Sequence, residues 1–277
     1  MSEYVGIGDI QLFVERQGRG EPLLLIPGLG AGTWLWTKNH AAWSKHFDLI
    51  MPELRGSGRS EKPDQRYTVA QFAHDLKIVL DHFGLDQVHI LGASLGGFVA
   101  QYLAAQWPER VNKLILASTS LGGQCQIEPA GEILSRIIRP RGKSRRERLE
   151  EAYALNFTPE FMARHPDELE RITEWRMANA QPEYIYYRQL LAGNAYDGAE
   201  RAKKITATTL ICAGKEDAMV PPENANLLHA AIPHAQIVIC EGRHMFFFEH
   251  YRSFNQIVVD FLNGNGSQVK EPGWPER

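Results

Sequence analysis

The sequence predicts an α/β protein built on a mostly parallel sheet, and three features of the chain support this fold class. Apolar runs of strand length recur along it. Segments with the apolar spacing of helices separate these runs, and turns that contain Gly or Pro connect the two. Strands that are apolar throughout are typical of parallel sheets, because helices cover both faces of such a sheet. The runs are residues 23–26, 47–51, 88–91, 114–117, 209–212 and 237–239.

The first fifty residues have the pattern of strands, and three runs carry this prediction. Residues 10–14 alternate between apolar and polar side chains, as in a half-buried strand. Residues 23–26 form a continuous apolar run that ends at Pro27, and residues 47–51 form another that ends at Pro52. Because proline interrupts regular structure, both strands are expected to stop there.

Helices and strands alternate in the next part of the chain. Thr68 opens a helix in which Gln71 completes a capping box, and Gly84 ends this helix. The later predicted elements are strand 88–91, a helix over residues 98–107, strand 114–117, strand 209–212, an amphipathic stretch over residues 225–231, strand 237–239 and a last helix at about residues 251–262.

Residues from about 121 to 204 break this alternation. They lack strand runs and have the pattern of several helices rich in Arg, Glu, Tyr and Leu. An all-helical insertion after a strand is expected to lie above the carboxyl edge of the sheet, as a cap. We therefore predict a core of residues 1–120 and 205–262, a helical cap of residues 121–204, and a mobile polar tail of residues 263–277.

Composition narrows the functional classes. The 277 residues, 44% of them hydrophobic, suffice for one α/β domain with an insertion or for two domains. A net charge of −3 does not point to nucleic acid or to a membrane surface. The three cysteines form no CxxC pair and no cluster of zinc-binding spacing, which predicts reduced thiols in a cytoplasmic protein. The N-terminal residues do not have the pattern of a signal peptide, and no apolar run has the length of a transmembrane helix.

Residues 92–96, Gly-Ala-Ser-Leu-Gly, form a Gly-x-Ser-x-Gly pentapeptide between a predicted strand and a predicted helix. This is the context of a nucleophile elbow, in which a sharp turn exposes the serine hydroxyl at the carboxyl edge of a sheet. Such a turn is crowded and strained, so glycine suits both outer positions. The alternative is an ordinary Gly-rich turn between strand and helix. The context favours the elbow, with Ser94 as the nucleophile.

A serine nucleophile needs a nearby base, and the base needs an acid that orients it. Asp217 follows strand 209–212, and His244 follows strand 237–239. Residues at the carboxyl ends of parallel strands converge on one crevice. The sequence therefore predicts that Ser94, Asp217 and His244 meet there.

Each of these residues also has an ordinary structural explanation. Asp217 could cap a turn, and Glu216 is the rival acid. A lone histidine is more often a surface or core residue than a base, and His250 is the rival base. His250 lies at a predicted helix entrance rather than at a strand end, which favours His244.

An acyl-transfer site also needs hydrogen-bond donors for the tetrahedral oxyanion. The backbone N–H of Leu95, directly after Ser94, is one candidate. The second is the N–H of Leu29, in the loop 27–30 that follows strand 23–26. The alternative for this loop is a plain Gly-rich turn.

Aromatic residues and a basic run add candidates for substrate contact. Trp34 and Met245 lie nearest the predicted site and are the candidate substrate-binding residues. At least half of the aromatic residues around them are expected in the core. The basic run is either a solvated helix face or a docking patch for an acidic carrier protein or a substrate carboxylate. Its members are Arg136, Arg139, Arg141, Lys143, Arg145, Arg146 and Arg148.

Over about residues 4–262 these motifs resemble the α/β-hydrolase superfamily of serine hydrolases, nearest to its small carboxylesterases and enol-lactone hydrolases. The loop 54–60, with sequence Leu-Arg-Gly-Ser-Gly-Arg-Ser, belongs to the same resemblance. The resemblance implies an eight-stranded sheet with a helical cap after the sixth strand. It also implies a nucleophile at Ser94, an acid at Asp217, a base at His244, and oxyanion donors at the N–H groups of Leu29 and Leu95. Acyl transfer of this kind needs no metal and no organic cofactor.

The chain departs from the family pattern at two positions. Pro27 stands where many members have histidine, and Ser57 stands where histidine or tyrosine is usual. Proline can neither donate a hydrogen bond nor titrate, so any role of that histidine is absent here. The N–H of Leu29 remains available, and Ser57 is expected to be a turn residue.

The expected function is hydrolysis of a carboxylic ester or lactone of a small, fairly apolar substrate through an acyl-enzyme on Ser94. Three alternatives remain open at this point. They are hydrolysis of a C–C bond in a ring-cleavage diketone, hydrolysis of a carrier-protein methyl ester, and ligand reception by a protein that keeps a vestigial triad. No nucleic-acid or membrane partner is expected.

Overall fold

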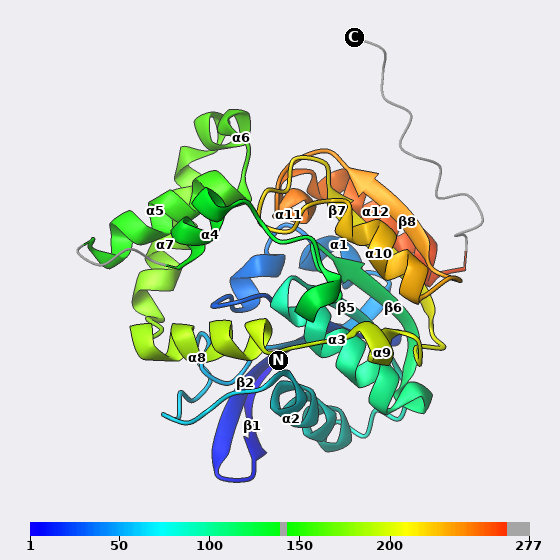
Figure 1. Ribbon diagram of the computed structural model, residues 1–277. Coiled ribbons are helices and arrows are strands. Elements are labelled where there is room, and N and C mark those ends of the chain that lie inside the picture. The colour runs from blue at the N-terminus through cyan, green and yellow to red at the C-terminus, as the bar shows by residue number, and fades with distance from the viewer. Residues whose placement is uncertain (139–142, 265–277) are drawn as a thin grey trace.

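The computed structural model describes residues 1–138 and 143–264. Its centre is an eight-stranded sheet with the strand order β1-β2-β4-β3-β5-β6-β7-β8 (Figure 1). The pairs β1–β2 and β2–β4 are antiparallel, and the remaining pairs are parallel. This confirms the predicted fold class. The strands are β1 (Ser2–Ile7), β2 (Ile10–Gly18), β3 (Glu21–Ile26), β4 (Phe47–Pro52), β5 (Val88–Ala93), β6 (Val111–Ala117), β7 (Thr208–Gly214) and β8 (Gln236–Cys240).

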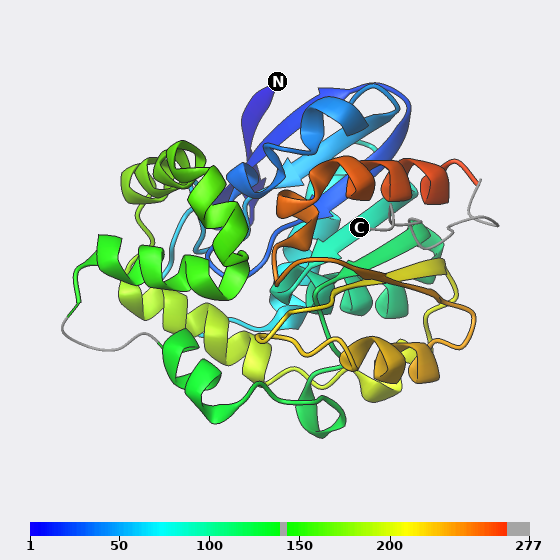
Figure 2. The same cartoon turned by 90° about the horizontal axis from the view of Figure 1, so that it is seen from above.

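Helices cover both faces of the sheet, as Figure 2 shows. Their apolar residues form one hydrophobic core on each face, which explains why the central strands are apolar throughout. One face carries α2 (Val69–His82), α3 (Leu95–Gln106) and α10 (Asn224–Ala231). The other carries α1 (His40–Trp43), α11 (Phe246–Glu249) and α12 (Tyr251–Leu262). Three short 3-10 helices are Thr33–Trp36, Pro108–Arg110 and Gly123–Cys125.

The chain between β6 and β7 contains the inserted helices. Helices α4 to α8 lie together on one side of the sheet in both views (Figures 1 and 2). The insertion of helices after the sixth strand agrees with the predicted fold, whereas the exact domain limits at residues 121 and 204 remain predictions. Most of the predicted tail, from residue 265 on, lies outside the described residues. The inserted helices are α4 (Gly131–Ile137), α5 (Arg145–Asn156), α6 (Pro159–Arg164), α7 (Pro166–Ala178), α8 (Glu183–Asn194) and α9 (Ala199–Ala202).

Three local predictions need correction. The first fifty residues, predicted as strands, also contain the 3-10 helix Thr33–Trp36 and helix α1. Helix α3 begins at Leu95 and not at residue 98, and its first turn contains two glycines, which are poor helix formers and hid this start in the sequence. At the start of α2, Thr68 Oγ1 accepts the Gln71 N–H at 3.1 Å, but the Gln71 side chain does not return the contact. Its Oε1 is buried and has no hydrogen-bond partner among the described residues. Only half of the predicted capping box therefore forms.

Candidate active site

Ser94 lies in a strained turn between β5 and α3. Its φ of 55° is in the left-handed region, which a non-glycine residue occupies only when its surroundings enforce it. A Cβ added at Gly92 would lie 2.3 Å from Gly96 O, and one added at Gly96 would lie 2.2 Å from Ile26 O. The turn therefore requires glycine at both positions. The Ser94 N–H donates to Ala117 O at 2.9 Å, which ties the turn to the end of β6.

Asp217 and His244 lie together at neighbouring strand ends. His244 Nδ1 is 2.8 Å from Asp217 Oδ2. The other carboxylate oxygen accepts the N–H groups of Met219 and Val220, both at 2.9 Å. Both side chains are buried, so the carboxylate is held in one orientation. When Nδ1 of a neutral imidazole donates its hydrogen to a carboxylate, Nε2 carries the free lone pair. Nε2 is therefore the nitrogen that can accept a proton.

The pocket geometry distinguishes these residues from their rivals. Ser94 and His244 line the same pocket. Glu216 is exposed at the surface. His250 is 39% exposed and lies at the start of α12, 3.9 Å from Glu249. The described structure therefore brings the predicted base and acid into contact, and it places the base in the pocket of Ser94.

Ser118 is a residue of this region that the sequence did not single out. It follows β6 directly and has a φ of 47°. Its Oγ donates to the backbone carbonyl of His244 at 2.7 Å, and its N–H donates to Cys212 O at 2.9 Å. These contacts fix the loop that carries His244 to the centre of the sheet. The only signal in the sequence is its position at the end of a buried strand.

The loop after β3 packs directly against Ser94. A Cβ added at Gly28 would lie 3.2 Å from Ser94 Cβ, so the backbone there passes very close to the serine. Leu29 follows and lines the pocket together with Ser94. Leu95 is the first residue of α3, and the first N–H groups of a helix have no acceptor within it. Both predicted donors thus belong to segments that adjoin the serine.

Two buried glutamines of the insertion, here called the glutamine latch, hold this loop. Gln181 precedes α8 and Gln189 lies within it, and both are almost completely buried. The latch was not predicted from the sequence. Gln189 Oε1 accepts from Gly30 N at 3.1 Å and from Gln181 Nε2 at 2.9 Å. Gln189 Nε2 donates to Arg55 O at 2.8 Å and to Ser57 Oγ at 2.9 Å. Gln181 Nε2 also donates to Gly56 O at 2.9 Å.

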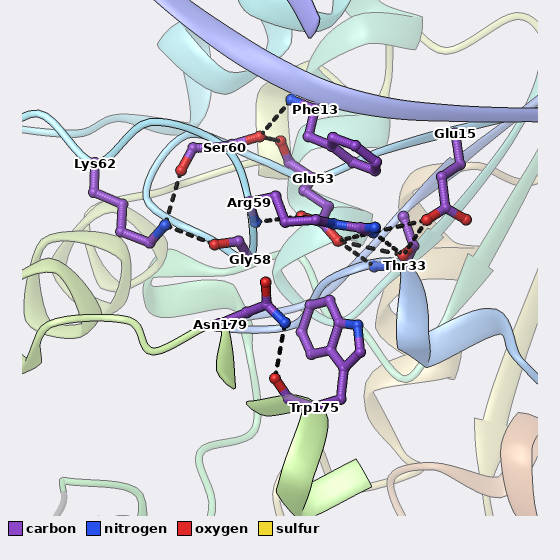
Figure 3. Close-up of polar contacts among 10 residues, drawn as sticks. All are labelled: Phe13, Glu15, Thr33, Glu53, Gly58, Arg59, Ser60, Lys62, Trp175 and Asn179. Atoms are coloured by element: carbon purple, nitrogen blue, oxygen red, sulfur yellow. Dashed lines mark hydrogen bonds and ion pairs between the residues drawn. The ribbon is translucent and has the colours of Figure 1, made fainter. Parts of the chain in front are cut away.

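A second polar network supports the residues that follow the loop (Figure 3). Glu53 is fully buried and accepts the Thr33 N–H at 3.1 Å and the Arg59 guanidinium at 2.8 Å. The guanidinium lies 3.6 Å from the ring centroid of Phe13 and 5.6 Å from that of Trp175 in α7. The network thus connects β2, the end of β4 and an inserted helix.

The two predicted substrate-binding residues line the pocket. Trp34 and Met245 border it together with Ser94 and His244. Most of the neighbouring aromatic residues are core residues, as expected. The fully buried ones are Trp36, Trp43, Phe246 and Phe248.

The described members of the basic run differ in their contacts. Arg145 donates to the backbone carbonyls of Gln181, at 2.6 Å, and Arg176, at 3.1 Å. Lys143 pairs with Glu151, and Arg146 pairs with Glu170 at 2.8 Å, as expected for a solvated helix face. Arg136 and Arg148 instead line the pocket. The predicted members Arg139 and Arg141 lie outside the described residues.

Within residues 1–138 and 143–264 no helix has the length and apolar character needed to cross a membrane. The same ranges contain no group of three or more His, Cys, Asp or Glu side chains placed to hold a metal ion.

Comparisons with known proteins agree with this architecture. A family model described as alpha/beta hydrolase fold matches residues 21–251. A poly(3-hydroxyalkanoate) depolymerase from Ectopseudomonas oleovorans is 28% identical, over 87% of this chain and 84% of its own. The crystal structure of an enol-lactonase from Burkholderia xenovorans superposes with a TM-score of 0.84 at 25% identity, covering 94% of this chain and 100% of its own. A thermophilic esterase from Thermogutta terrifontis gives 0.82 at 25% identity, covering 95% and 98%. The chain therefore belongs to the α/β-hydrolase fold family.

Proposed function

We propose that this hydrolase cleaves a carboxylic ester or lactone through an acyl-enzyme on Ser94. The observation that carries the proposal is the buried hydrogen bond between His244 Nδ1 and Asp217 Oδ2 beside the pocket that Ser94 lines. The likeness to an esterase and to an enol-lactonase supports the same reaction class. The mostly apolar lining around Trp34 and Met245 supports a small organic substrate.

The reaction consists of two acyl transfers. Ser94 Oγ attacks the substrate carbonyl while His244 Nε2 takes the hydroxyl proton, and a tetrahedral intermediate forms. The C–O bond to the leaving group then breaks, and His244 returns the proton to the leaving alkoxide. Water attacks the acyl-enzyme in the same way, so that the acid product leaves and Ser94 regains its proton. Asp217 stabilises the imidazolium that forms in each half of the reaction.

The oxyanion of each tetrahedral intermediate needs donors next to Ser94. The N–H groups of Leu29 and Leu95 fill this role in the proposed mechanism. The close approach of Gly28 to Ser94 and the position of Leu95 at the first turn of α3 support the assignment. Pro27 supplies no donor, so this mechanism uses the loop only through its backbone.

The test is the Ser94→Ala variant, assayed with p-nitrophenyl acetate. We expect kcat to fall by at least about 10³-fold, because the nucleophile is lost. Circular dichroism should show an unchanged fold. Ser253→Ala is the matched control, because Ser253 is an exposed residue of α12 that does not line the pocket. Retention of most activity in Ser94→Ala would contradict the proposal.

Two further measurements separate the remaining alternatives. A fluorophosphonate probe should label Ser94 in the enzyme, whereas a receptor with a vestigial triad would remain unlabelled. A chromogenic dienoate tested beside p-nitrophenyl acetate distinguishes C–C hydrolysis from ester hydrolysis. Contact with an acidic carrier protein and a cytoplasmic location remain predictions from the sequence.

A further inference from the structure

The space around Ser94 consists of two adjoining lobes. Both are lined by Ser94 and His244, together with Leu29, Ile137 and Met219. A substrate that is cleaved at Ser94 can therefore place one part in each lobe. The two lobes differ in charge, and this difference bears on the class of substrate.

One lobe, here called the arginine lobe, is positively charged. Arg136, Arg148 and Arg176 line it, and its described lining contains no Asp or Glu. The other lobe contains Glu128 and, within its described lining, no Arg or Lys. The three arginines come from three different helices, α4, α5 and α7, so the fold converges positive charge on one wall.

Two of these arginines lack a carboxylate partner within the described part of the chain. Arg136 donates to Glu151 O at 3.4 Å, and Arg148 donates to Lys143 O at 2.5 Å. Both acceptors are backbone carbonyls, which do not neutralise the guanidinium charge. The Nε atom of Arg148 is buried and has no hydrogen-bond partner among the described residues. A buried donor without an acceptor is costly, so part of the hydrogen-bonding capacity of Arg148 is unused.

The third arginine of the lobe contacts an aromatic lining residue. The Arg176 guanidinium is 5.4 Å from the ring centroid of Trp34, which also lines the lobe. Burial raises the pKa of the Tyr153 phenol, and the positive charge of Arg176 opposes this rise. Tyr153 and Arg176 both line the lobe.

We propose that the substrate is an ester or lactone that carries a carboxylate, which the arginine lobe binds while the scissile carbonyl lies at Ser94. This inference rests on the proposed function. A planar guanidinium matches a carboxylate with two parallel hydrogen bonds. The rest of the lobe is largely apolar, with Leu35, Ala152 and Leu155. A monoanionic carboxylate is desolvated there at lower cost than a dianionic phosphate.

The test compares probes that differ only in charge. 4-Nitrophenyl hydrogen glutarate carries the carboxylate on the acyl side, and methyl 4-nitrophenyl glutarate is its neutral counterpart. 4-Acetoxybenzoate and its methyl ester place the same difference on the alcohol side. We expect kcat/KM to be about 10- to 100-fold higher for the anion in at least one pair. The ratio should decrease as NaCl is added, because salt screens the attraction. Ratios near one in both pairs would overturn the inference.

Substitutions assign the preference to the arginine lobe. Arg148→Met and Arg176→Met should each reduce the ratio between anionic and neutral probe several-fold, and Arg148→Lys should keep part of it. Arg146→Met is the matched control, because Arg146 lies on the same helix, pairs with Glu170 and does not line the lobe. A ratio that both lobe variants leave unchanged would overturn the inference even if the wild-type enzyme prefers anions.

Failure of the inference and failure of the proposed function have different signatures. If neutral and anionic probes are hydrolysed equally and the fluorophosphonate labels Ser94, the inference is wrong and the proposed function stands. If no probe is hydrolysed and Ser94 is not labelled, both are wrong. If the lobe variants fail to fold, the salt dependence of the wild-type ratio decides, since a ratio independent of NaCl contradicts a charged lobe.

Discussion

Replacing Gln189 by Met should weaken the attachment of α8 to the loops that its side chain contacts. Methionine is similar in length and volume, so the change removes polar contacts with little change in packing. Gln189 makes four side-chain hydrogen bonds, two through Oε1 and two through Nε2. The Gln189 side chain is fully buried, and all four bonds lead to residues outside α8.

The expected loss of stability follows from these contacts. A hydrogen bond contributes about 0.5–1.5 kcal/mol net, so four of them give a loss of roughly 2–6 kcal/mol in the free energy of unfolding. The effect on catalysis has a separate cause. Gly30 loses the acceptor for its N–H, and the neighbouring Leu29 N–H, an oxyanion donor in the proposed mechanism, is then less well fixed. Loss of a complete oxyanion donor costs about 10²- to 10³-fold in kcat, so a loosened donor should cost less, about tenfold.

Urea unfolding followed by tryptophan fluorescence measures the first effect, and kcat and KM for p-nitrophenyl acetate measure the second. Gln256→Met is the matched control, because Gln256 is exposed on α12 and bonds only Asp260 among the described residues. An unfolding free energy for Gln189→Met within about 0.5 kcal/mol of wild type would refute the assignment of the latch. A normal stability loss with unchanged kcat would refute the link between Gly30 and the oxyanion donor.

Two further predictions concern buried charges. Asp75→Leu leaves Arg55 without its bidentate partner, at 2.5 and 2.7 Å, in a site where both side chains are 5% exposed. Thermal or urea unfolding should show a loss of about 3–5 kcal/mol, which the double variant Arg55→Met, Asp75→Leu largely recovers; a double variant no more stable than the single one contradicts this. Burial lowers the pKa of His89 although Glu21 opposes the shift. The unfolded chain therefore binds the proton more readily, and stability should decline as the pH falls below about 6.5, by at most about 1.4 kcal/mol per pH unit. His89→Gln should reduce this decline between pH 7 and 5.5, and equal slopes would count against it.

Much of the fold could be predicted because its signals are local. The apolar runs at β3, β5 and β6 and the turns after them are visible in short windows of sequence. Asp217 and His244 could be proposed together for the same reason, since each follows a strand directly, and the structure places them in contact. Strand β1 lies at the edge of the sheet, where few of its side chains are buried. It therefore has no apolar run and was not predicted.

The contacts that escaped prediction join residues far apart in the chain. Gln189 is bonded to Gly30 across 159 positions, and a buried glutamine has no periodic pattern that would indicate its partner. The contacts of the arginines in the basic run could not be predicted either. Composition could not show that Arg146 faces acids while Arg148 faces the pocket, because neighbouring positions on a helix point in different directions.

The position of the insertion between β6 and β7 determines how much stability is lost when helices are added to it or removed from it. These two strands are neighbours in the sheet, so folding must close a loop of residues 118–207. The entropy of loop closure grows only with the logarithm of loop length, and doubling the loop costs about 0.6 kcal/mol. Helices could therefore be added or removed here with little loss of stability. Because the same segment supplies the arginine lobe, substrate preference could be altered without rebuilding the sheet that holds Ser94, Asp217 and His244.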